Sequence, residues 1–464
     1  MKTRIIPGAV SSTTLRALVL SEQSSPPALT LSDLRGAPCP PLSVKPHGSG
    51  DPRFDQHVIG AGVYLYVAEA SGLRPGADYQ IGKTHIRTLP RQLPAAGLSI
   101  ALASCYSDDF KRDDDYLRVL QGAAGYNPLA AKVLVGDNVY LDVGPGVGSE
   151  RSAFESAADI YLKHFWRSGY ADVLSYLPTF TMWDDHEFWN NYPERQIWLP
   201  RSMGSAHALY KAAALAGIKA FQAVLNPTPA SRGGLSYRFE LPGLSVFALD
   251  LRAGRSMHEV TSPVMCSEAE LQAFERWAHN LKGPGAVIVG QPLWSCPGDW
   301  KDWNPPAFTA QFTRIWKALA AAPFDIVILT GDVHHSRLLE ICVGPGRRVW
   351  ELVSSPVCHI PTIESIVAQS FDKQDRGRVN FTQSLSVPGV PLALTAFHMG
   401  TNDNNSLALM RLMPAKDGLA IAGTFVDLVR KAPAKPADPP AGSPVAPGAN
   451  SCQRDPMFVL RART

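Results

Sequence analysis

The sequence predicts a layered α/β domain preceded by a small all-β sandwich, and three observations support this prediction. From about residue 96 onward, apolar strand-like runs alternate with amphipathic helical stretches. Before that point the chain is rich in Pro, Ser, Gly and β-branched residues, and Val63, Leu65 and Val67 alternate with two tyrosines at a period of two. Several apolar runs of the larger part also end on polar, ligand-type side chains. We divide the chain into a β-sandwich over residues 1–93, an α/β domain over residues 96–430 and a Pro-rich C-terminal tail over residues 431–464.

The N-terminal region contains a turn followed by a tyrosine. The stretch LRPGADY, residues 73–79, is similar to the tyrosine corner of a fibronectin type III or immunoglobulin-like sandwich. In such a corner the tyrosine hydroxyl is hydrogen-bonded to a neighbouring backbone group. We expect Tyr79 to do the same, and we interpret RTLPRQLPAAG as the linker into the larger domain.

One helix of the larger domain has a clear start and stop. Ser267 and Glu270 predict a capping box, and Gly283 with Pro284 ends the helix. Further helices are expected around residues 154–168 and 206–225. Residues 431–456 show no periodicity and read as an extended tail, whereas the final MFVLRART could return to the domain as a strand.

Composition limits the classes of partner and compartment. The 464 residues carry 44 basic and 41 acidic side chains, well mixed along the chain, for a net charge of +3. Because no Lys/Arg run could follow a phosphate backbone, we expect no nucleic-acid partner. No uninterrupted apolar stretch approaches about 18 residues, so we expect no membrane span. Protein partners stay unknown from the sequence.

The seven cysteines and the N-terminus indicate the compartment. The cysteines lie far apart without a C-x-x-C pair, which favours a reducing environment. The N-terminus lacks a signal-like apolar run. We therefore expect a cytoplasmic protein, or a periplasmic or secreted one if an export segment has been removed.

The stretch FDIVILTGDVHHSRLLE, which starts at Phe324, poses the functional question. Its apolar run has no polar alternation, which fits a strand covered on both faces. Asp332, His334 and His335 follow that run, at the edge of the sheet where open α/β folds place ligands. Taken alone, these residues could equally cap a helix or satisfy a loop backbone.

Four more strand-like runs end in the same manner, and each residue also has a plain structural interpretation. Cys105 could be a small buried hydrophobe, Asp137 a helix N-cap and Tyr140 a core aromatic. Arg252 and Arg255 could be partners in surface salt bridges. The cluster Asp184-Asp185-His186-Glu187 is harder to explain structurally, because four titratable residues after an apolar strand are costly to bury unpaired. The residues at the four ends are Cys105; Asp137 and Tyr140; Asp184, Asp185, His186, Glu187 and Asn191; and Asp250, Arg252 and Arg255.

Taken together, these strand ends predict a two-metal hydrolytic centre. Carboxylates, an imidazole, a thiolate and a phenolate form the ligand mixture that such a centre needs. One carboxylate would have to bridge the two ions.

In their order along the chain, these motifs resemble the alkaline phosphatase D (PhoD-like) branch of the calcineurin-like metallophosphoesterases. The motifs are GDNVY from Gly136, WDDHE from Trp183, LDLR from Leu249 and TGDVH from Thr330, and the resemblance spans most of residues 96–360. It implies a four-layer α-β-β-α domain with a dinuclear metal centre, often preceded by a small β-sandwich. It also implies hydrolysis of small-molecule phosphoesters, as a phosphomonoesterase acting through a metal-activated water.

The resemblance also implies a role for each site residue. Asp137 would bridge the two ions and act in catalysis, and His186 would assist the leaving oxygen. The metal ligands would be Cys105, Asp137, Tyr140, Asp185, Asp332 and His334. The residues near substrate would be Asn191, Arg252, Arg255 and His335, and His335 would also be a candidate to support a metal ligand.

Cys105 stands where the wider superfamily has an Asp-x-His pair, so the metals need not be those of ordinary calcineurin-like enzymes. A thiolate with a phenolate favours ferric iron, with calcium, manganese or zinc as the second metal. Two alternatives stay open at this point. One is a phosphodiesterase or phospholipase D-like activity on the same site, and the other is a non-catalytic metal-containing binding protein.

Overall fold

The structure is a computed structural model that describes most of the chain. The described residues are 1–107, 113–122, 129–142, 153–195, 200–257, 259–294, 308–358, 382–387, 393–402, 405–428 and 457–463. The central part of the Pro-rich tail, residues 431–456, lies outside them.

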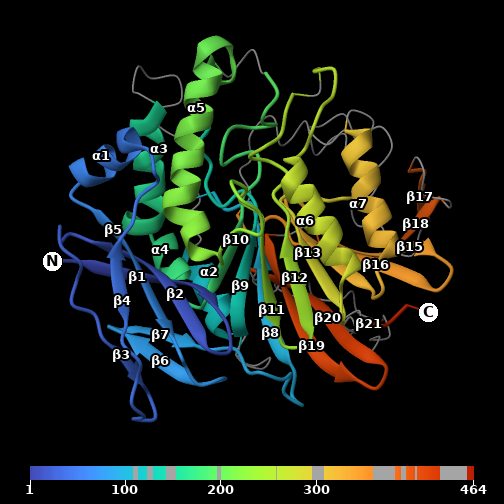
Figure 1. The fold of residues 1–464 in the computed structure, drawn as a ribbon, viewed down its shortest axis with the longest axis horizontal. Coiled ribbons are helices and arrows are strands. Elements are labelled where there is room, and N and C mark those ends of the chain that lie inside the picture. The colour runs from blue at the N-terminus through green and yellow to red at the C-terminus, as the bar shows by residue number, and fades with distance from the viewer. Residues whose placement is uncertain are drawn as a thin grey trace, which may run out of the picture.

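Two antiparallel sheets and one helix form the N-terminal region (Figure 1). Their elements are β1 (Thr3–Val10), β2 (Thr14–Ser21), β3 (Leu31–Asp33), β4 (Ser43–Pro46), α1 (Pro52–Gly60), β5 (Tyr64–Ser71), β6 (Asp78–Ile81) and β7 (Thr84–Arg87). The strand orders are β1-β2-β5-β4 and β3-β6-β7. The Arg74 backbone N–H donates to the Tyr79 hydroxyl at 2.9 Å, which confirms the bond expected at the tyrosine corner.

The expected alternation in β5 is wrong at two adjacent positions. Tyr66 is 2 % exposed and donates its hydroxyl to the Gln23 carbonyl at 2.7 Å, whereas Val67 is only half-buried. The tyrosine can occupy a buried position because its single polar atom has a partner there.

Two larger mixed sheets form the rest of the fold. The six-stranded sheet has the order β10-β9-β8-β19-β20-β21, and the eight-stranded sheet has the order β11-β12-β13-β14-β16-β15-β18-β17. The first contains β8 (Leu98–Ala103), β9 (Leu129–Val135), β10 (Thr179–Met182), β19 (Ser406–Ala415), β20 (Gly418–Asp427) and β21 (Met457–Leu460). The second contains β11 (Tyr237–Leu241), β12 (Leu244–Ala248), β13 (Gly285–Ile288), β14 (Ile326–Thr330), β15 (Ser336–Gly344), β16 (Arg347–Val353), β17 (Thr382–Leu385) and β18 (Leu394–Asn402). Strands β8 to β10 run parallel, as do β12, β13, β14 and β16.

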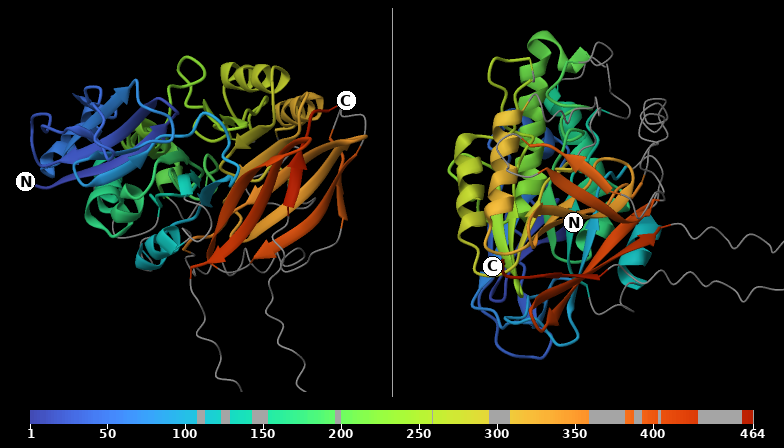
Figure 2. Two further views of the ribbon diagram at one scale, coloured as in Figure 1. Left: turned by 90° about the horizontal axis from the view of Figure 1, so that it is seen from below. Right: turned by 90° about the vertical axis from the view of Figure 1, so that its right-hand side faces the viewer.

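Helices cover the two large sheets from opposite sides (Figure 2). They are α2 (Asp113–Gly122), α3 (Ala153–Leu162), α4 (Tyr170–Ser175), α5 (Gly204–Gly217), α6 (Glu268–His279) and α7 (Thr309–Ala321). Shorter turns are the π-helical η3 (Lys163–Arg167) and η5 (Ile218–Gln222) and the 3-10 helical η4 (Pro200–Ser202) and η6 (Ala223–Leu225).

The fully buried strand β14 shows how the layers pack. Ile326 and Ile328 belong to the core beneath α6 and α7, whereas Val327 and Leu329 face the core between the two sheets. On the far side, Lys132 of β9 donates to the Leu174 and Leu177 carbonyls at the end of α4. The mixed α/β fold with an antiparallel N-terminal region is therefore confirmed. The boundary near residue 93 stays a prediction, since one apolar core continues across it.

The start of α6 agrees only in part with a capping box. Ser267 is the N-cap, and its hydroxyl accepts the Glu270 N–H. The Glu270 carboxylate does not return to the Ser267 N–H as a capping box would have it. It accepts the Ser267 hydroxyl and the N–H groups of Leu235 and Ser236 instead. A tertiary contact has replaced half of the local motif.

One helix among the described residues, Gly204–Leu225, is long and apolar enough to cross a membrane by length and composition alone. Of the apolar 18-residue window within that stretch, 56 % is buried inside the protein, and Phe221 stacks on Tyr161 of α3. It is a core helix.

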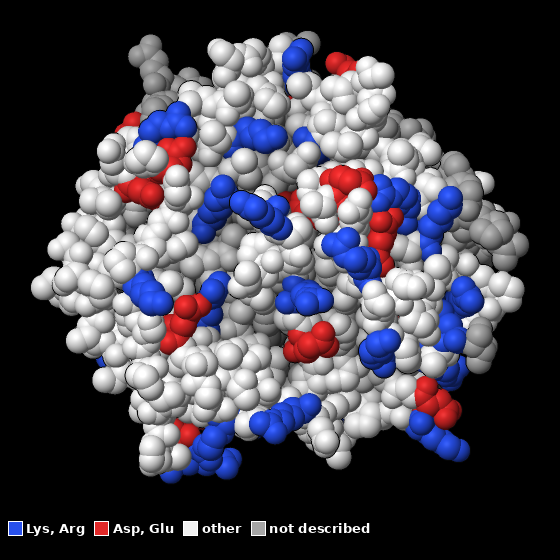
Figure 3. All heavy atoms as spheres, in the orientation of Figure 1, with Lys and Arg blue, Asp and Glu red and all other residues white. Residues whose placement is uncertain are grey.

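On the face shown in Figure 3, basic and acidic side chains lie interspersed, as the mixed composition predicted.

The last strand is held in place by a buried ion pair. The Arg463 side chain is 2 % exposed, and its Nε lies 2.9 Å from Oδ1 of Asp325. The same guanidinium donates to the Leu319, Ala320 and Ala322 carbonyls, at the C-terminal end of α7. It therefore joins the chain end to both a helix and a sheet.

We expect Arg463→Ala to lower the free energy of unfolding by about 3–5 kcal/mol, because it leaves a buried carboxylate without its cation. Chemical denaturation measures the change. Arg461→Ala is the matched control, since this arginine is exposed on the same segment and should shift stability by less than about 0.5 kcal/mol. Equal effects from the two variants would contradict the role of the pair.

Candidate metal centre

The ends of four parallel strands from both large sheets meet at one place. Cys105 follows β8, Asp137 follows β9, Asp185 follows β10 and Asp332 follows β14. These strand ends therefore lie together in space, as the sequence analysis expected.

Glycines make this close approach of the two sheets possible. A Cβ at Gly331 would lie 2.3 Å from the Ser104 side chain, and a Cβ at Gly290 would lie 2.6 Å from Oδ1 of Asp184. Side chains cannot tolerate such distances, so any larger residue would push the strand ends apart. The end of β16 adds a link between the sheets, because the Ser104 hydroxyl donates to the Ser354 carbonyl at 2.8 Å.

The backbone at these strand ends adopts an uncommon conformation. Among the described non-glycine residues, six have positive φ, and five of them are predicted site residues. Such angles persist only where the surroundings impose them, and they cluster at functional sites. The five are Cys105 (φ 56°), Asp137 (52°), Asn191 (57°), Asp332 (70°) and His334 (55°).

The ligand-type atoms form two groups that share one residue. Asp137, Asp185 and His186 each offer an atom within 4.8 Å of the others, and so do Asp184, Asp185 and Asp332. Asp185 belongs to both. Its Oδ2 accepts the Asn191 N–H, whereas its Oδ1 is buried and has no hydrogen-bond partner among the described residues.

Cys105 and Tyr140 extend the first group. The Cys105 thiol is fully buried and lies 3.4 Å from Oδ2 of Asp137 and 3.2 Å from the Ser355 hydroxyl. Burial, together with the negative charge of Asp332, raises the pKa of this thiol to about 12. The Tyr140 ring lies 4.2 Å from the His186 ring, and burial raises the pKa of its phenol well above the usual range.

These residues have the properties of a site for cations. Burial, followed by the charges of Cys105 and Asp185, raises the pKa of Asp137 well above its usual range. Buried carboxylates in that position are unfavourable unless a cation offsets them. The unpartnered oxygen of Asp185 and the oxygen, sulfur and nitrogen donors nearby fit metal ions.

His186 is held by an aspartate that the sequence analysis did not single out. Its Nδ1 lies 2.9 Å from Oδ1 of Asp142, and the Asn190 N–H donates to Oδ2 of the same carboxylate (2.6 Å). Burial alone would lower the pKa of His186, but the charges of Asp142 and Asp185 outweigh it and raise the pKa to about 10. The spacing Asp137-x-x-Tyr140-x-Asp142 was the available signal.

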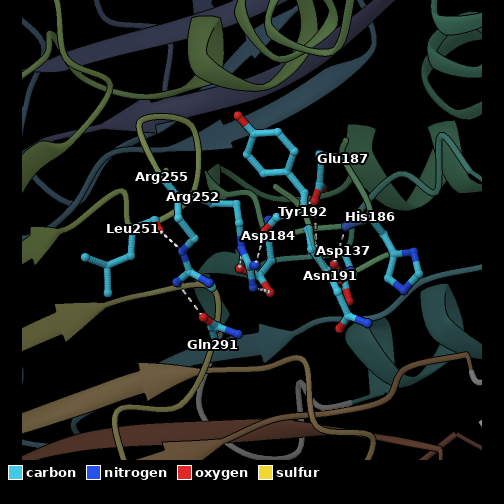
Figure 4. A network of polar contacts seen from close by, with 12 residues as sticks. Asp137, Asp184, His186, Glu187, Asn191, Tyr192, Leu251, Arg252, Arg255 and Gln291 are labelled. Atoms are coloured by element: carbon cyan, nitrogen blue, oxygen red, sulfur yellow. Dashed lines mark hydrogen bonds and ion pairs between the residues drawn. The ribbon is translucent and has the colours of Figure 1, made fainter. Parts of the chain in front are cut away.

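Asp184, the neighbour of Asp185, is neutralised by a fully buried arginine (Figure 4). The guanidinium of Arg252 donates two bonds of 2.8 Å to the Asp184 carboxylate and one to the Tyr192 carbonyl. Arg252 follows β12 and is only 1 % exposed. This bidentate pair therefore joins the loop after β12 to the loop after β10.

The other residues predicted near substrate lie as follows. Arg255 is 2 % exposed and donates to the Leu251 carbonyl and to Gln291 (Figure 4). His335 directs its Nδ1 to the Val333 carbonyl, and His334 donates its N–H to Ser355. Contact of Arg252, Arg255, Asn191 and His335 with a substrate stays a prediction.

Comparisons with known proteins add little to this picture. Among solved structures, the chain is similar to "GAP50 the anchor in the inner membrane complex of Plasmodium", with a TM-score of 0.36 and 9 % identity over 79 % of this chain and 89 % of that one. A likeness this loose carries no argument. No protein-family model matches the chain. No curated protein matches it either.

We expect Gly331→Ala to destabilise the protein by about 1–3 kcal/mol or more, because the added methyl overlaps Ser104 and the Val135 carbonyl. Gly344→Ala is the control, since its Cβ would meet only the Arg347 side chain at 3.5 Å. Thermal unfolding of both variants measures the difference. A Gly331→Ala protein as stable as the control would show that the sheets do not need this approach.

Proposed function

We propose that the protein is a metal-dependent phosphoesterase of the alkaline phosphatase D branch of the calcineurin-like metallophosphoesterases, and that it hydrolyses phosphomonoesters. The observation that carries this proposal is Asp185, a buried carboxylate that belongs to two groups of ligand-type residues and has one oxygen without a hydrogen-bond partner among the described residues. The motifs around it, GDNVY, WDDHE, LDLR and TGDVH, supply the family.

Cys105, Asp137, Tyr140 and Asp185 would hold the metals together with Asp332 and His334. Ferric iron is the proposed first metal, with calcium, manganese or zinc as the second. When bound, such ions activate a water molecule and neutralise charge on a transferring phosphoryl group. The carboxylates and the thiol of this chain would hold the positive charge of the metal ions next to His186.

His186 would serve the leaving group. Its Nδ1 faces Asp142, which keeps a proton on that nitrogen and leaves Nε2 to face the ester oxygen. The side chain is 14 % exposed, so it is not sealed into the core. A protonated imidazole in this position can give its proton to the departing alkoxide.

The metal assignment is tested by elemental analysis beside hydrolysis of p-nitrophenyl phosphate. We expect wild type to hold one iron and a second metal per chain and to hydrolyse the ester. Cys105→Ala should lose the iron and most of the activity, because the thiolate is the soft ligand of the set.

Cys266→Ala is the matched control, since this cysteine is also fully buried but lies under α6 and α7. It should keep both metals. Iron retained by Cys105→Ala would make that cysteine a core residue, and wild type without metal or activity would sink the proposal. A strong preference for the bis-ester over the monoester would replace the phosphomonoesterase by a phosphodiesterase.

The role of His186 predicts a dependence on the leaving group. His186→Gln should lower kcat on an alkyl phosphate by about 10²–10⁴ and should lower it much less on p-nitrophenyl phosphate, because nitrophenolate departs without a proton. Asp142→Asn should show the same pattern in weaker form. A loss equal for both esters would assign His186 to binding rather than to proton transfer.

A further inference from the structure

We infer that Gln222, in the π-helical turn at the end of α5, is a positioning residue for the metal ligands and acts through Glu187. This inference rests on the proposed function, since it concerns the same site. Among the described residues, the Gln222 side chain forms hydrogen bonds with Asn138, Tyr161 and Glu187 and not with the proposed ligands.

Glu187 joins the two loops that carry the central ligands. One carboxylate oxygen accepts the N–H groups of Asp137 (3.1 Å) and Asp184 (2.9 Å), and the other accepts the N–H of Asn138 (2.7 Å). The loop after β9 and the loop after β10 are thus bound to one side chain. Because Glu187 is 0 % exposed, water cannot replace any of these bonds.

Gln222 fixes the orientation of Glu187. Its Nε2 donates to Oε1 of Glu187 at 3.2 Å and to the Tyr161 hydroxyl at 3.1 Å. Its Oε1 accepts from Nδ2 of Asn138 at 3.3 Å. The orientation of the amide follows from these partners, because a carboxylate only accepts hydrogen bonds and Asn138 Nδ2 only donates.

The π-helical turn brings this amide to the site. In η5 the N–H of Ala223 bonds to the Ile218 carbonyl, five residues back, so the turn holds one residue more than an α-helical turn. The extra residue turns the buried Gln222 side chain toward the strand ends, while Phe221 packs on Tyr161. Such π-turns inside helices recur at functional sites. The carbonyl of Gln222 also accepts the Thr181 hydroxyl of β10, which ties the turn to the sheet.

Gln222→Met removes the amide while keeping the length of the side chain. We expect the affinity for metal, measured by competition with a chelator, to fall by about 10–100-fold, as for other supports of metal ligands. We also expect kcat to fall while KM changes little. In the metal-free protein, hydrogen exchange should accelerate in peptides covering residues 134–142 and 182–189.

Gln311→Met is the matched control. Gln311 is a buried amide whose side-chain hydrogen bonds among the described residues go to Met265 and Cys266, not to the loops that carry the proposed ligands. The Gln311→Met variant should lower stability comparably, but it should leave metal affinity and hydrogen exchange in the peptides 134–142 and 182–189 unchanged. If Gln222→Met binds metal as tightly as wild type, or if the control loses affinity equally, the inference is wrong and the proposed function stands. If wild type binds no metal the proposed function fails, and the exchange data still decide whether Gln222 orders the two loops.

Discussion

The close contact between the ends of β8–β10 and the end of β14 is the constraint on which the rest of the site depends. At Gly290 and Gly331 the two sheets approach so closely that an added Cβ would lie 2.7 Å from a backbone oxygen of the other sheet, that of Trp183 and that of Val135 respectively. Ligand-type side chains from four strands can converge only because of this contact. The positive φ angles of residues such as Cys105 and Asp137 follow from the same geometry, because the backbone must turn sharply where it leaves each strand.

Much of this arrangement could be read from the sequence because its signals are local. The continuous apolar run of β14 and the acidic and histidine residues after it are adjacent in the chain. The start of α6 at Ser267 and the end of the long helix before Pro227 are also written in a few neighbouring residues. The sequence therefore predicted the layered fold class and which strand ends would bring ligand-type side chains together.

What the sequence could not supply depends on long-range contacts. Glu187 sits inside a recognised motif, yet its bonds to Asn138 and Gln222 exist only once β9, β10 and α5 are packed. Arg252 reads as a surface cation until Asp184 is placed beside it. Helix α1 was missed although Asp51 and Pro52 are a proper cap and first residue, because the short stretch lies within a β-rich region.

The position of β21 has a consequence for how the protein is made. This strand covers the edge of β20, and Phe458 stacks on Trp350 with a centroid distance of 4.8 Å. It begins at Met457, 30 residues after β20 ends at Asp427. During synthesis the six-stranded sheet therefore waits for residues made well after β20. Until they arrive, β20 presents unpaired N–H and carbonyl groups, the kind of exposed edge onto which strands of other chains add. A chain that lacks β21 therefore exposes an edge that favours aggregation.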